Sequence, residues 1–507
     1  MKTIALDGHN LTIEHIFQYS IETDFQFTIA DSAITKVLES RQYVLDVVQS
    51  KVPTYGVNTG FGALSNKHIN IQDLSQLQIN LIRSHCVGVG EPFSAPIVRS
   101  MMLVLVHSLL KGYSGIQIEA IELIVDFLNH HIIPVIPEKG SVGASGDLAP
   151  LSHIAVCLIG EGEVFHNGER QPTARVLQKT NLQPIKLGPK DGLALINGTH
   201  LMTALAIHGV MESRNLIKTA DLACALSLDG IRGSIRAYDE DLHSVKAHSG
   251  QVTSAKNIRT LLQGSDILQS HQGCDRVQDP YSFRCAPQVH GAVRQTLRHA
   301  EEVLNTELQS VTDNPIVFAS KKKIISGGHF HGEALALILD YLAIGVAELC
   351  SISERRVVKM LNPEFSQLPA FLTNSSGLES GLMIAQYTSA SLVSENKILC
   401  HPSSVDSVPT SNDKEDHVSM GPMAGRKLLQ IIFNAQQCLA IEFLCNAQAI
   451  HLLRPLQSSP AMENTLFQIQ KNVPAILEDR YFAKDIAVLA QMIHRHELVH
   501  SCSIELQ

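Results

Sequence analysis

The sequence predicts a mainly α-helical protein with a long central helix bundle, an N-terminal domain and a few small β-hairpins. Two long, largely apolar stretches, several shorter helical patterns and the scarcity of strand signals predict this class. A helix with a wide apolar surface needs neighbours on several sides, which a bundle supplies. We expect a soft boundary between the N-terminal domain, residues 1–215, and a central and C-terminal helical bundle, residues 216–507.

Two long helices are predicted in the second half of the chain. In 333–356 the charged positions are 333, 340, 348, 354, 355 and 356, and the first spacings place charges on one side of a helix. Most of that helix is therefore apolar and needs partners, within the chain or across subunits. The second helix is predicted over 425–453, where Glu442 is the only charge after Arg426 and Lys427.

Shorter elements complete the predicted fold. Strand signals are few, and two of them form hairpins. The first surrounds an Asn-Gly turn within 164–169, a dipeptide that favours tight hairpin turns. The second joins 316–318 to 323–325 across a tip of three lysines. Shorter helices are predicted at 97–111, 116–132, 201–216, 292–311 and 381–399.

Composition excludes several classes of protein. The chain has 507 residues, a formal charge of −9 and no basic domain, which argues against binding to nucleic acid. Its ten cysteines form no Cys-x-x-Cys pair and suit buried thiols in a reducing compartment. We expect no membrane span, because no apolar run is long enough, and no signal peptide at the N-terminus. A cytoplasmic protein is expected.

The most informative segment is Gly140–Pro150, where small residues surround Ser145. The amide nitrogen of Gly146 can attack the carbonyl carbon of Ala144, because neither residue carries bulk and glycine tolerates unusual torsions. Loss of water from the ring and from the serine side chain leaves an electron-poor ring made from the backbone. The alternative is a glycine-rich turn before a helix. A hydrolase elbow needs glycine where Asp147 stands, and no Gly-x-Gly-x-x-Gly loop occurs here.

Six further segments accompany this run in a fixed order. With it, the chain resembles the methylidene-imidazolone (MIO) aromatic amino-acid ammonia-lyases, and among them the histidine ammonia-lyases. The resemblance implies conversion of L-histidine to trans-urocanate and ammonia by a mainly helical homotetramer whose active sites each draw residues from three subunits. The segments are Tyr55–Gly62, Ser84–His85, Gly192–Thr199, Gln278–Cys285, Ser326–His331 and Glu415–Gly421.

The resemblance implies that the MIO electrophile forms from Ala144, Ser145 and Gly146, so that no external cofactor is needed. Such an electrophile is wanted because the amine is a poor leaving group and the β-proton is hard to remove. Tyr55 matches the family's base, which removes this proton. A tyrosine can serve only if its pKa falls from about 10 towards the working pH, as positive helix N-termini could achieve. Otherwise Tyr55 is a packed aromatic in a turn.

Five more residues are assigned by resemblance. Arg284 matches the group that binds the substrate carboxylate, for which the two-pronged guanidinium is suited. Asn197, Gln278 and Tyr281 match polar positions around the electrophile and the substrate amine, with Tyr281 among the catalytic residues. Phe330 matches an aromatic that lies against the substrate or the ring. Taken singly, each also suits an ordinary structural role, in hydrogen bonds, ion pairs or core packing.

His85 and Glu415 are the expected readers of the substrate side chain. An imidazole nitrogen can donate or accept a hydrogen bond, whereas a phenyl ring does neither. Phenylalanine would leave these polar groups unpaired, at a cost of roughly 1–3 kcal/mol each. The pair therefore favours histidine over phenylalanine or tyrosine.

Four positions depart from the family pattern, namely His200, Ala286, His329 and Lys414. They leave open a related enzyme acting on tyrosine or phenylalanine, as a lyase or an aminomutase. An inactive paralogue is the remaining alternative.

His496–His500 matches the His-Glu-x-x-His zinc-protease motif. Only seven residues follow it, which leaves no room for a downstream third ligand. We interpret it as a polar C-terminal helix, and the other histidines show no spacing typical of metal sites.

Overall fold

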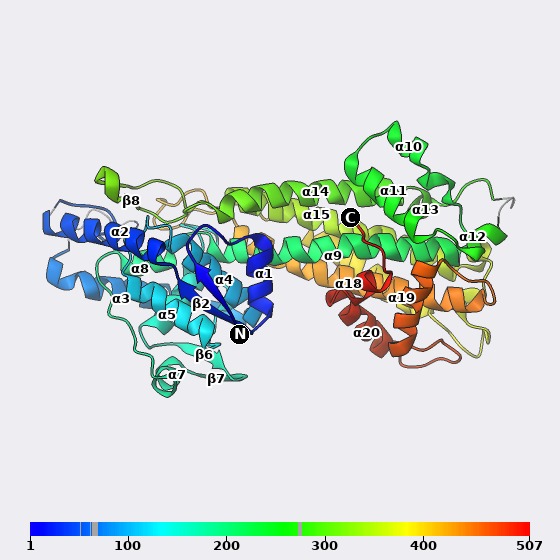
Figure 1. Cartoon of the computed structure of the whole chain (residues 1–507), viewed down its shortest axis with the longest axis horizontal. Helices are drawn as coiled ribbons and strands as arrows, with labels where there is room; N and C mark the ends of the chain where they lie inside the picture. Colours follow the sequence, from blue (N-terminus) through cyan, green and yellow to red (C-terminus); the bar gives the residue numbers. More distant parts are fainter. Residues whose placement is uncertain (51, 61, 63–68, 272–275) are drawn as a thin grey trace. The chain divides into compact units, whose positions relative to one another are not determined.

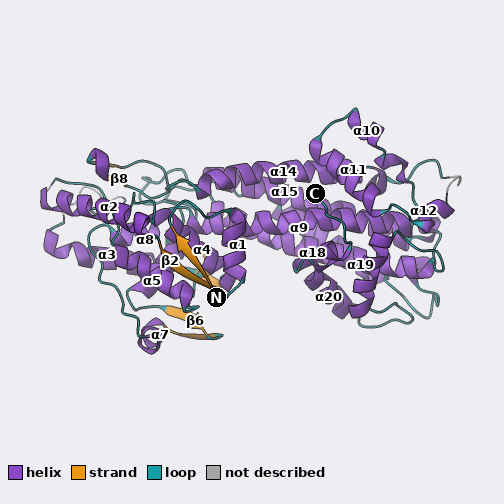
Figure 2. Cartoon of the chain, viewed as in Figure 1, coloured by secondary structure: helices purple, strands orange, loops and turns teal. Residues whose placement is uncertain are grey.

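The computed structural model describes residues 1–50, 52–60, 62, 69–271 and 276–507 (Figure 1). Helices make up most of this part of the chain, and the strands are few and short (Figure 2). The predicted mainly α class is therefore confirmed. Phe61 of the predicted Tyr55 segment and Cys274 lie outside the described residues; the nine described cysteines are free thiols.

The α-helices run in chain order as follows. The first part of the chain holds α1 Ile13–Ile21, α2 Asp31–Ser50, α3 Leu74–His85, α4 Ala95–Leu109, α5 Ile118–Asn129, α6 Ala149–Leu158, α7 Thr173–Thr180 and α8 Asp191–Ile196. The middle holds α9 His200–Gly230, α10 Glu240–Ser244, α11 Ser249–Leu261, α12 Asp266–Ser270, α13 Tyr281–Arg284 and α14 Ala286–Leu308. The last part holds α15 Glu333–Leu361, α16 Pro363–Ser366, α17 Met383–Leu399, α18 Gly421–Leu452, α19 Pro460–Asn472, α20 Phe482–His494 and α21 Glu497–Ser501.

The strands form small sheets. Both predicted hairpins are confirmed, as β6 Glu163–His166 with β7 Glu169–Pro172 and β8 Ile316–Phe318 with β9 Lys323–Ile325. The strands without a sequence prediction are β1 Lys2–Leu6, β2 Phe25–Ile29, β3 Val89–Pro92, β4 Ile133–Pro134 and β5 Pro137–Lys139. β1 pairs with β2 in parallel, β3 with β5, and β4 with β6.

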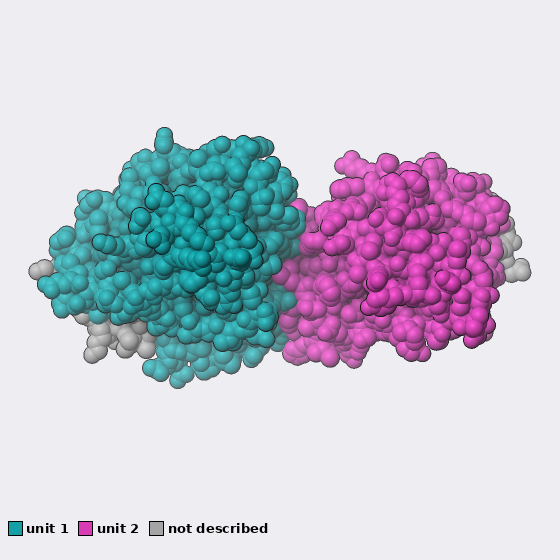
Figure 3. Space-filling model, turned by 90° about the horizontal axis from the view of Figure 1, so that it is seen from below, with its two compact units in different colours: residues 1–208, 301–339, 402–426 teal, residues 209–300, 340–401, 427–507 magenta. Residues whose placement is uncertain are grey.

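The chain divides into two compact units (Figure 3). Unit 1 comprises residues 1–208, 301–339 and 402–426, and unit 2 comprises residues 209–300, 340–401 and 427–507. The sequence expectation was one boundary near residue 215, whereas these units interleave along the chain. The reason is that α9, α14, α15 and α18 each carry residues of both units, so the chain changes unit inside helices.

The predicted helices are present, but α9 is much longer than the expected 201–216. Its last turns contain the acidic residues Asp221 and Asp229. In unit 2 both side chains are buried. Asp221 accepts hydrogen bonds from His290 and Arg294, each at 2.7 Å, so the helix continues through a buried polar cluster.

Helices α15 and α18 are long and apolar enough to cross a membrane by length and composition alone. However, 67% and 78% of their most apolar windows are buried inside the protein. Core helices of soluble proteins have the same properties, and the predicted central bundle requires them.

The His-Glu-x-x-His segment does not form the single polar helix that the sequence suggested. Helix α20 ends at His494, and His496 has a left-handed backbone with φ of 61° before α21 begins at Glu497. The zinc-protease motif needs both histidines on one helix face. Here His496 lies at the N-terminal cap of α21, where its carbonyl oxygen accepts from the N–H of His500 at 3.1 Å, and the described residues place no group of three candidate metal ligands around this pair.

Candidate active site

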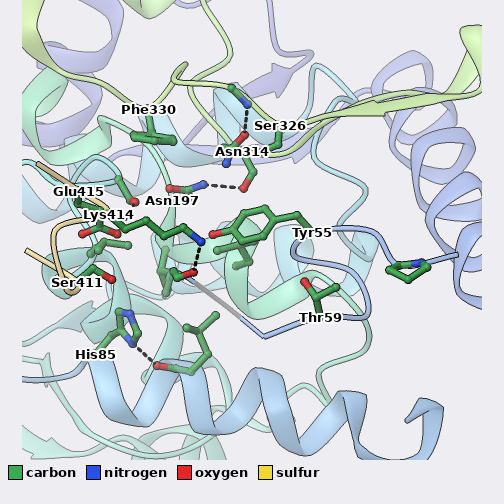
Figure 4. Close-up of a pocket in the computed structure, with 18 residues that line it drawn as sticks. Tyr55, Thr59, His85, Asn197, Asn314, Ser326, Phe330, Ser411, Lys414 and Glu415 are labelled. Atoms are coloured by element: carbon green, nitrogen blue, oxygen red, sulfur yellow. Dashed lines mark hydrogen bonds between the residues drawn. The ribbon is translucent and has the colours of Figure 1, made fainter. Parts of the chain in front are cut away.

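Unit 1 contains a cavity of about 860 Å³ whose lining includes several of the site residues predicted from the sequence (Figure 4). Six predicted residues line it, from segments far apart in the chain. They are Tyr55, His85, Ser145, Asn197, Phe330 and Glu415. The remaining lining residues are Pro53, Thr59, Gly62, Leu81, Leu148, Leu193, Ile196, Asn314, Ser326, Gly327, Ser411 and Lys414.

The loop before α6 holds Ser145 in an unusual backbone conformation. Ser145 has φ of 50° and Gly146 has φ of 79°, both in the left-handed region that side chains disfavour. A Cβ atom at Gly146 would lie 2.0 Å from the carbonyl oxygen of Gly198, so only glycine fits there. The backbone N–H of Asp147 donates to that same oxygen at 2.7 Å. The segment is thus pressed against Gly198 in a strained, bulk-free arrangement.

Asp147 ties this loop to the start of α9. Its side chain is buried and accepts hydrogen bonds from the backbone N–H groups of Leu201 (2.5 Å) and Met202 (3.3 Å). Burial raises the pKa of Asp147 to about 8, although these two hydrogen bonds act in the opposite direction. The sequence analysis assigned Asp147 no role. The only signal in the sequence that could have identified it is its position directly after Gly146.

Asn197 presents a polar atom without a protein partner. It follows the last residue of α8, and its Nδ2 donates to the carbonyl oxygen of Asn314 at 2.7 Å (Figure 4). Its Oδ1 is buried and has no hydrogen-bond partner among the described residues. A buried acceptor left unpaired costs about 1–3 kcal/mol, so Asn197 suits a bound donor such as an ammonium group.

Asn314 is a lining residue that the sequence analysis missed. Its Oδ1 accepts from the backbone N–H of Gly327 at 2.7 Å, and its carbonyl accepts from Asn197. It therefore connects Asn197 to the segment that carries Phe330 (Figure 4).

The loop that carries Tyr55 is anchored by its neighbour Val57. Val57 is buried in a small apolar cluster with Val44 and Val48 of α2, Leu74 of α3 and Val317 of β8. Burying a valine contributes roughly 1.5–3 kcal/mol, which is enough to hold a short loop. The adjacent Gly56 has φ of 73°, and a Cβ atom there would lie 2.5 Å from Leu193. Glycine is required for this close approach.

The pKa of Tyr55 is raised, not lowered as the sequence analysis required of a base. Burial is the main cause, and the Glu415 carboxylate adds to it, while a hydrogen bond from the backbone of Gly62 lowers the pKa. Lys414 also reaches Gly62, donating from Nζ to its carbonyl oxygen at 3.3 Å. Lys414 thus brings a basic side chain to the lining of the cavity. The sequence analysis had identified this position only as a departure from the family pattern.

His85 is the last residue of α3, and its ring is oriented by the helix. Nδ1 lies 2.8 Å from the carbonyl oxygen of Leu81 one turn earlier. A proton on Nδ1 donates to that carbonyl and leaves the lone pair of Nε2 as an acceptor. Burial lowers the pKa of His85, partly offset by Leu81 and Glu415, and so favours the neutral ring.

Glu415 is held by a tight hairpin. Thr410 and Glu415 exchange backbone hydrogen bonds of 2.9 and 3.3 Å, and the Thr410 hydroxyl donates to Oε2 at 2.9 Å. Ser145 Oγ donates to the other carboxylate oxygen at 3.5 Å. The carboxylate that is expected to read the substrate ring therefore lies beside the serine that is expected to form the electrophile.

Gln278, Tyr281 and Arg284 belong to unit 2 and are not among the residues that line the cavity. The Arg284 guanidinium lies 4.4 Å from the centre of the Tyr281 ring, and its Nε donates to the carbonyl oxygen of Asp279 at 3.1 Å. Tyr281 is 70% exposed. In unit 2 the side chains of Gln278 and Tyr281 are exposed, and that of Arg284 is half-buried.

A model of the aromatic amino acid lyase family matches residues 11–471, and the chain belongs to this family. The helical fold and the position of Ser145 in the lining of the cavity agree with that membership.

Particular relatives carry a narrower activity in their names. The chain is 45% identical to a histidine ammonia-lyase of Myxococcus xanthus, over 98% of this chain and 97% of the relative. A solved histidine ammonia-lyase of Trypanosoma cruzi is 40% identical, with a TM-score of 0.92 over 99% of this chain and 95% of the other. A tyrosine aminomutase of Streptomyces globisporus is 35% identical, with a TM-score of 0.94 over the full length of both chains. The backbone is therefore similar in proteins that are named for different substrates, so the substrate must be determined by side chains.

Proposed function

We propose that this enzyme converts L-histidine to trans-urocanate and ammonia. The observation that carries the proposal is the placement of Ser145, His85 and Glu415 around one cavity, with Ser145 and Glu415 in contact. An imidazole N–H can donate to the Glu415 carboxylate or to Nε2 of His85, whereas a phenyl ring offers no donor. The names of the relatives with about 45% identity support the same substrate.

Ala144, Ser145 and Gly146 would form the MIO group. The left-handed backbone at Ser145 and Gly146 and the absence of room for a Cβ at Gly146 suit a cyclised tripeptide. When formed, this group supplies an electron-poor ring that makes loss of the amine possible. Asn197 Oδ1, buried and without a hydrogen-bond partner among the described residues, would accept from the substrate ammonium group.

Tyr55 is the proposed base for the β-proton. Its pKa is raised by burial in the single chain, so the phenolate needs added positive charge. In the proposed homotetramer, Arg284 of a second subunit would supply this charge and bind the substrate carboxylate. The exposure of Tyr281 supports this completion of the site by another copy. Gln278 and Phe330 would complete the enclosure.

The test is ultraviolet absorbance while the purified protein is incubated with L-histidine. Growth of the urocanate band supports the proposal, and parallel incubations with L-tyrosine and L-phenylalanine test the related activities. The intact mass separates the remaining outcomes. A mass deficit of two waters without turnover of histidine points to another substrate, whereas no deficit and no turnover point to an inactive paralogue.

We also propose a cytoplasmic location, which suits the nine free cysteines among the described residues.

A further inference from the structure

Two histidines and a glutamate from two distant segments meet in unit 1, outside the cavity lining. They are His331, Glu333 and His417, and one candidate ligand atom of each lies within 4.8 Å of the others. Glu333 is the first residue of α15 and His331 comes two residues before it, whereas His417 lies 86 residues further on, ahead of α18. The sequence spacing gave no sign of this group, because the fold alone brings its members together.

One carboxylate oxygen of Glu333 lacks a hydrogen-bond donor or a cation among the described residues. Its Oε2 is buried and has no hydrogen-bond partner among the described residues. A buried carboxylate oxygen without a donor or a cation is costly, and native proteins seldom leave one in that state. The two histidines are the neighbouring groups that can share a cation with it.

The ring of His331 is oriented in the way that metal-binding histidines usually are. Its Nε2 lies 3.2 Å from the backbone carbonyl oxygen of His417. When Nε2 carries the proton and donates to that carbonyl, Nδ1 keeps its lone pair for a metal ion. A hydrogen bond from the second ring nitrogen to a carbonyl fixes the ring and strengthens it as a ligand.

We propose that His331, Glu333 and His417 bind a divalent transition-metal ion of the Zn²⁺ type. Two imidazole nitrogens and one carboxylate oxygen suit Zn²⁺, whereas Mg²⁺ and Ca²⁺ prefer oxygen ligands alone. Three protein ligands leave a fourth position for water. His331 follows Phe330, and His417 follows Glu415 by two residues, so the ion joins the two segments that carry these cavity residues. The proposal requires neither the electrophile nor histidine turnover.

The test is calorimetric titration of ZnCl₂ into the metal-stripped full-length protein without any amino acid present. We expect binding that weakens by at least about tenfold in both Glu333→Gln and His417→Asn, because each removes a ligand. His329→Asn is the matched control, since it removes a nearby exposed histidine that is outside the group, and its isotherm should equal that of the wild type. Thermal unfolding without metal identifies any variant that has not folded, and Glu333→Gln keeps the size of the side chain.

Free cysteines are the competing ligands, and Co²⁺ distinguishes them. Co²⁺ held by nitrogen and oxygen shows visible ligand-field bands without the intense near-ultraviolet charge-transfer band of a cobalt–thiolate bond. Bands of the first kind that vanish in both variants support the site. Absent Zn²⁺ binding, a wild-type isotherm in both folded variants, or a thiolate band that persists in them would overturn it.

Discussion

Replacing Glu415 with glutamine tests the central assumption about substrate choice. The side chain keeps its shape, and the amide oxygen can still accept from the Thr410 hydroxyl, which donates at 2.9 Å in the native hairpin. What disappears is the negative charge that is proposed to receive an imidazole N–H. A hydrogen bond to a charged group contributes about 1.5–3 kcal/mol.

At about 1.4 kcal/mol for each factor of ten, this loss lowers kcat/KM for L-histidine by about 10- to 150-fold. The free energy of unfolding should change by less than about 0.5 kcal/mol, because Glu415 is not fully buried, its two backbone hydrogen bonds with Thr410 remain, and the glutamine oxygen can still accept from the Thr410 hydroxyl. The variant should also shift the pH profile. Burial raises the pKa of Tyr55 and Glu415 raises it further, so removal of the charge should move to lower pH the limb on which the rate rises as the base ionises.

The assays are urocanate formation across a range of pH and urea unfolding of the same preparations. Asp416→Asn is the control, because it removes a neighbouring exposed carboxylate that does not line the cavity. The reasoning is refuted if Glu415→Gln loses stability in proportion to activity, or if Asp416→Asn loses as much activity.

Three further substitutions test the loop that carries Ser145. Ser145→Ala should abolish the two-water mass deficit and nearly all turnover while the chain stays folded; intact mass with a turnover assay checks this, and an active variant would contradict it. Gly146→Ala places a Cβ atom 2.0 Å from the Gly198 carbonyl oxygen, so urea unfolding should reveal a loss of about 3 kcal/mol or more. Burial raises the folded pKa of Asp147 to about 8, so its contribution to stability is present below pH 4 and is lost as the pH rises towards 8. Asp147→Asn should therefore reduce the fall in unfolding free energy between pH 5 and pH 8, and an unchanged fall would contradict the role of this carboxyl group.

The sequence predicted the helical architecture because its signals are local. The long apolar faces of α15 and α18 and the Asn-Gly turn between β6 and β7 depend on neighbouring residues. The parallel pairing of β1 with β2 brings together residues more than twenty positions apart, which no local pattern in either strand specifies. The interleaved units could not be predicted from local signals either, because the chain passes from one unit to the other inside continuous helices, where the sequence has no linker.

The residues of the candidate site also fall into those that local sequence signals predict and those that only the fold reveals. Motif order led to the six predicted residues that line the cavity, because each lies in a recognisable local segment. The contact of Asn197 with Asn314, the reach of Lys414 to Gly62 and the group formed with His417 depend on packing between distant segments. The left-handed residue His496 is the reverse case, in which the sequence matches a motif but its first histidine lies at a helix cap and not inside a continuous helix.

The four helices shared between the units also constrain how relatives can exchange parts. Unit 1 is built from three separate stretches of the chain, and so is unit 2. A single recombination point therefore cannot transfer either unit whole from one gene to another. It leaves each hybrid with hydrophobic cores assembled from two parents, whose side chains have not been selected to fit each other. Substrate specificity in such a protein is more readily altered by single residues around the cavity than by exchange of gene segments.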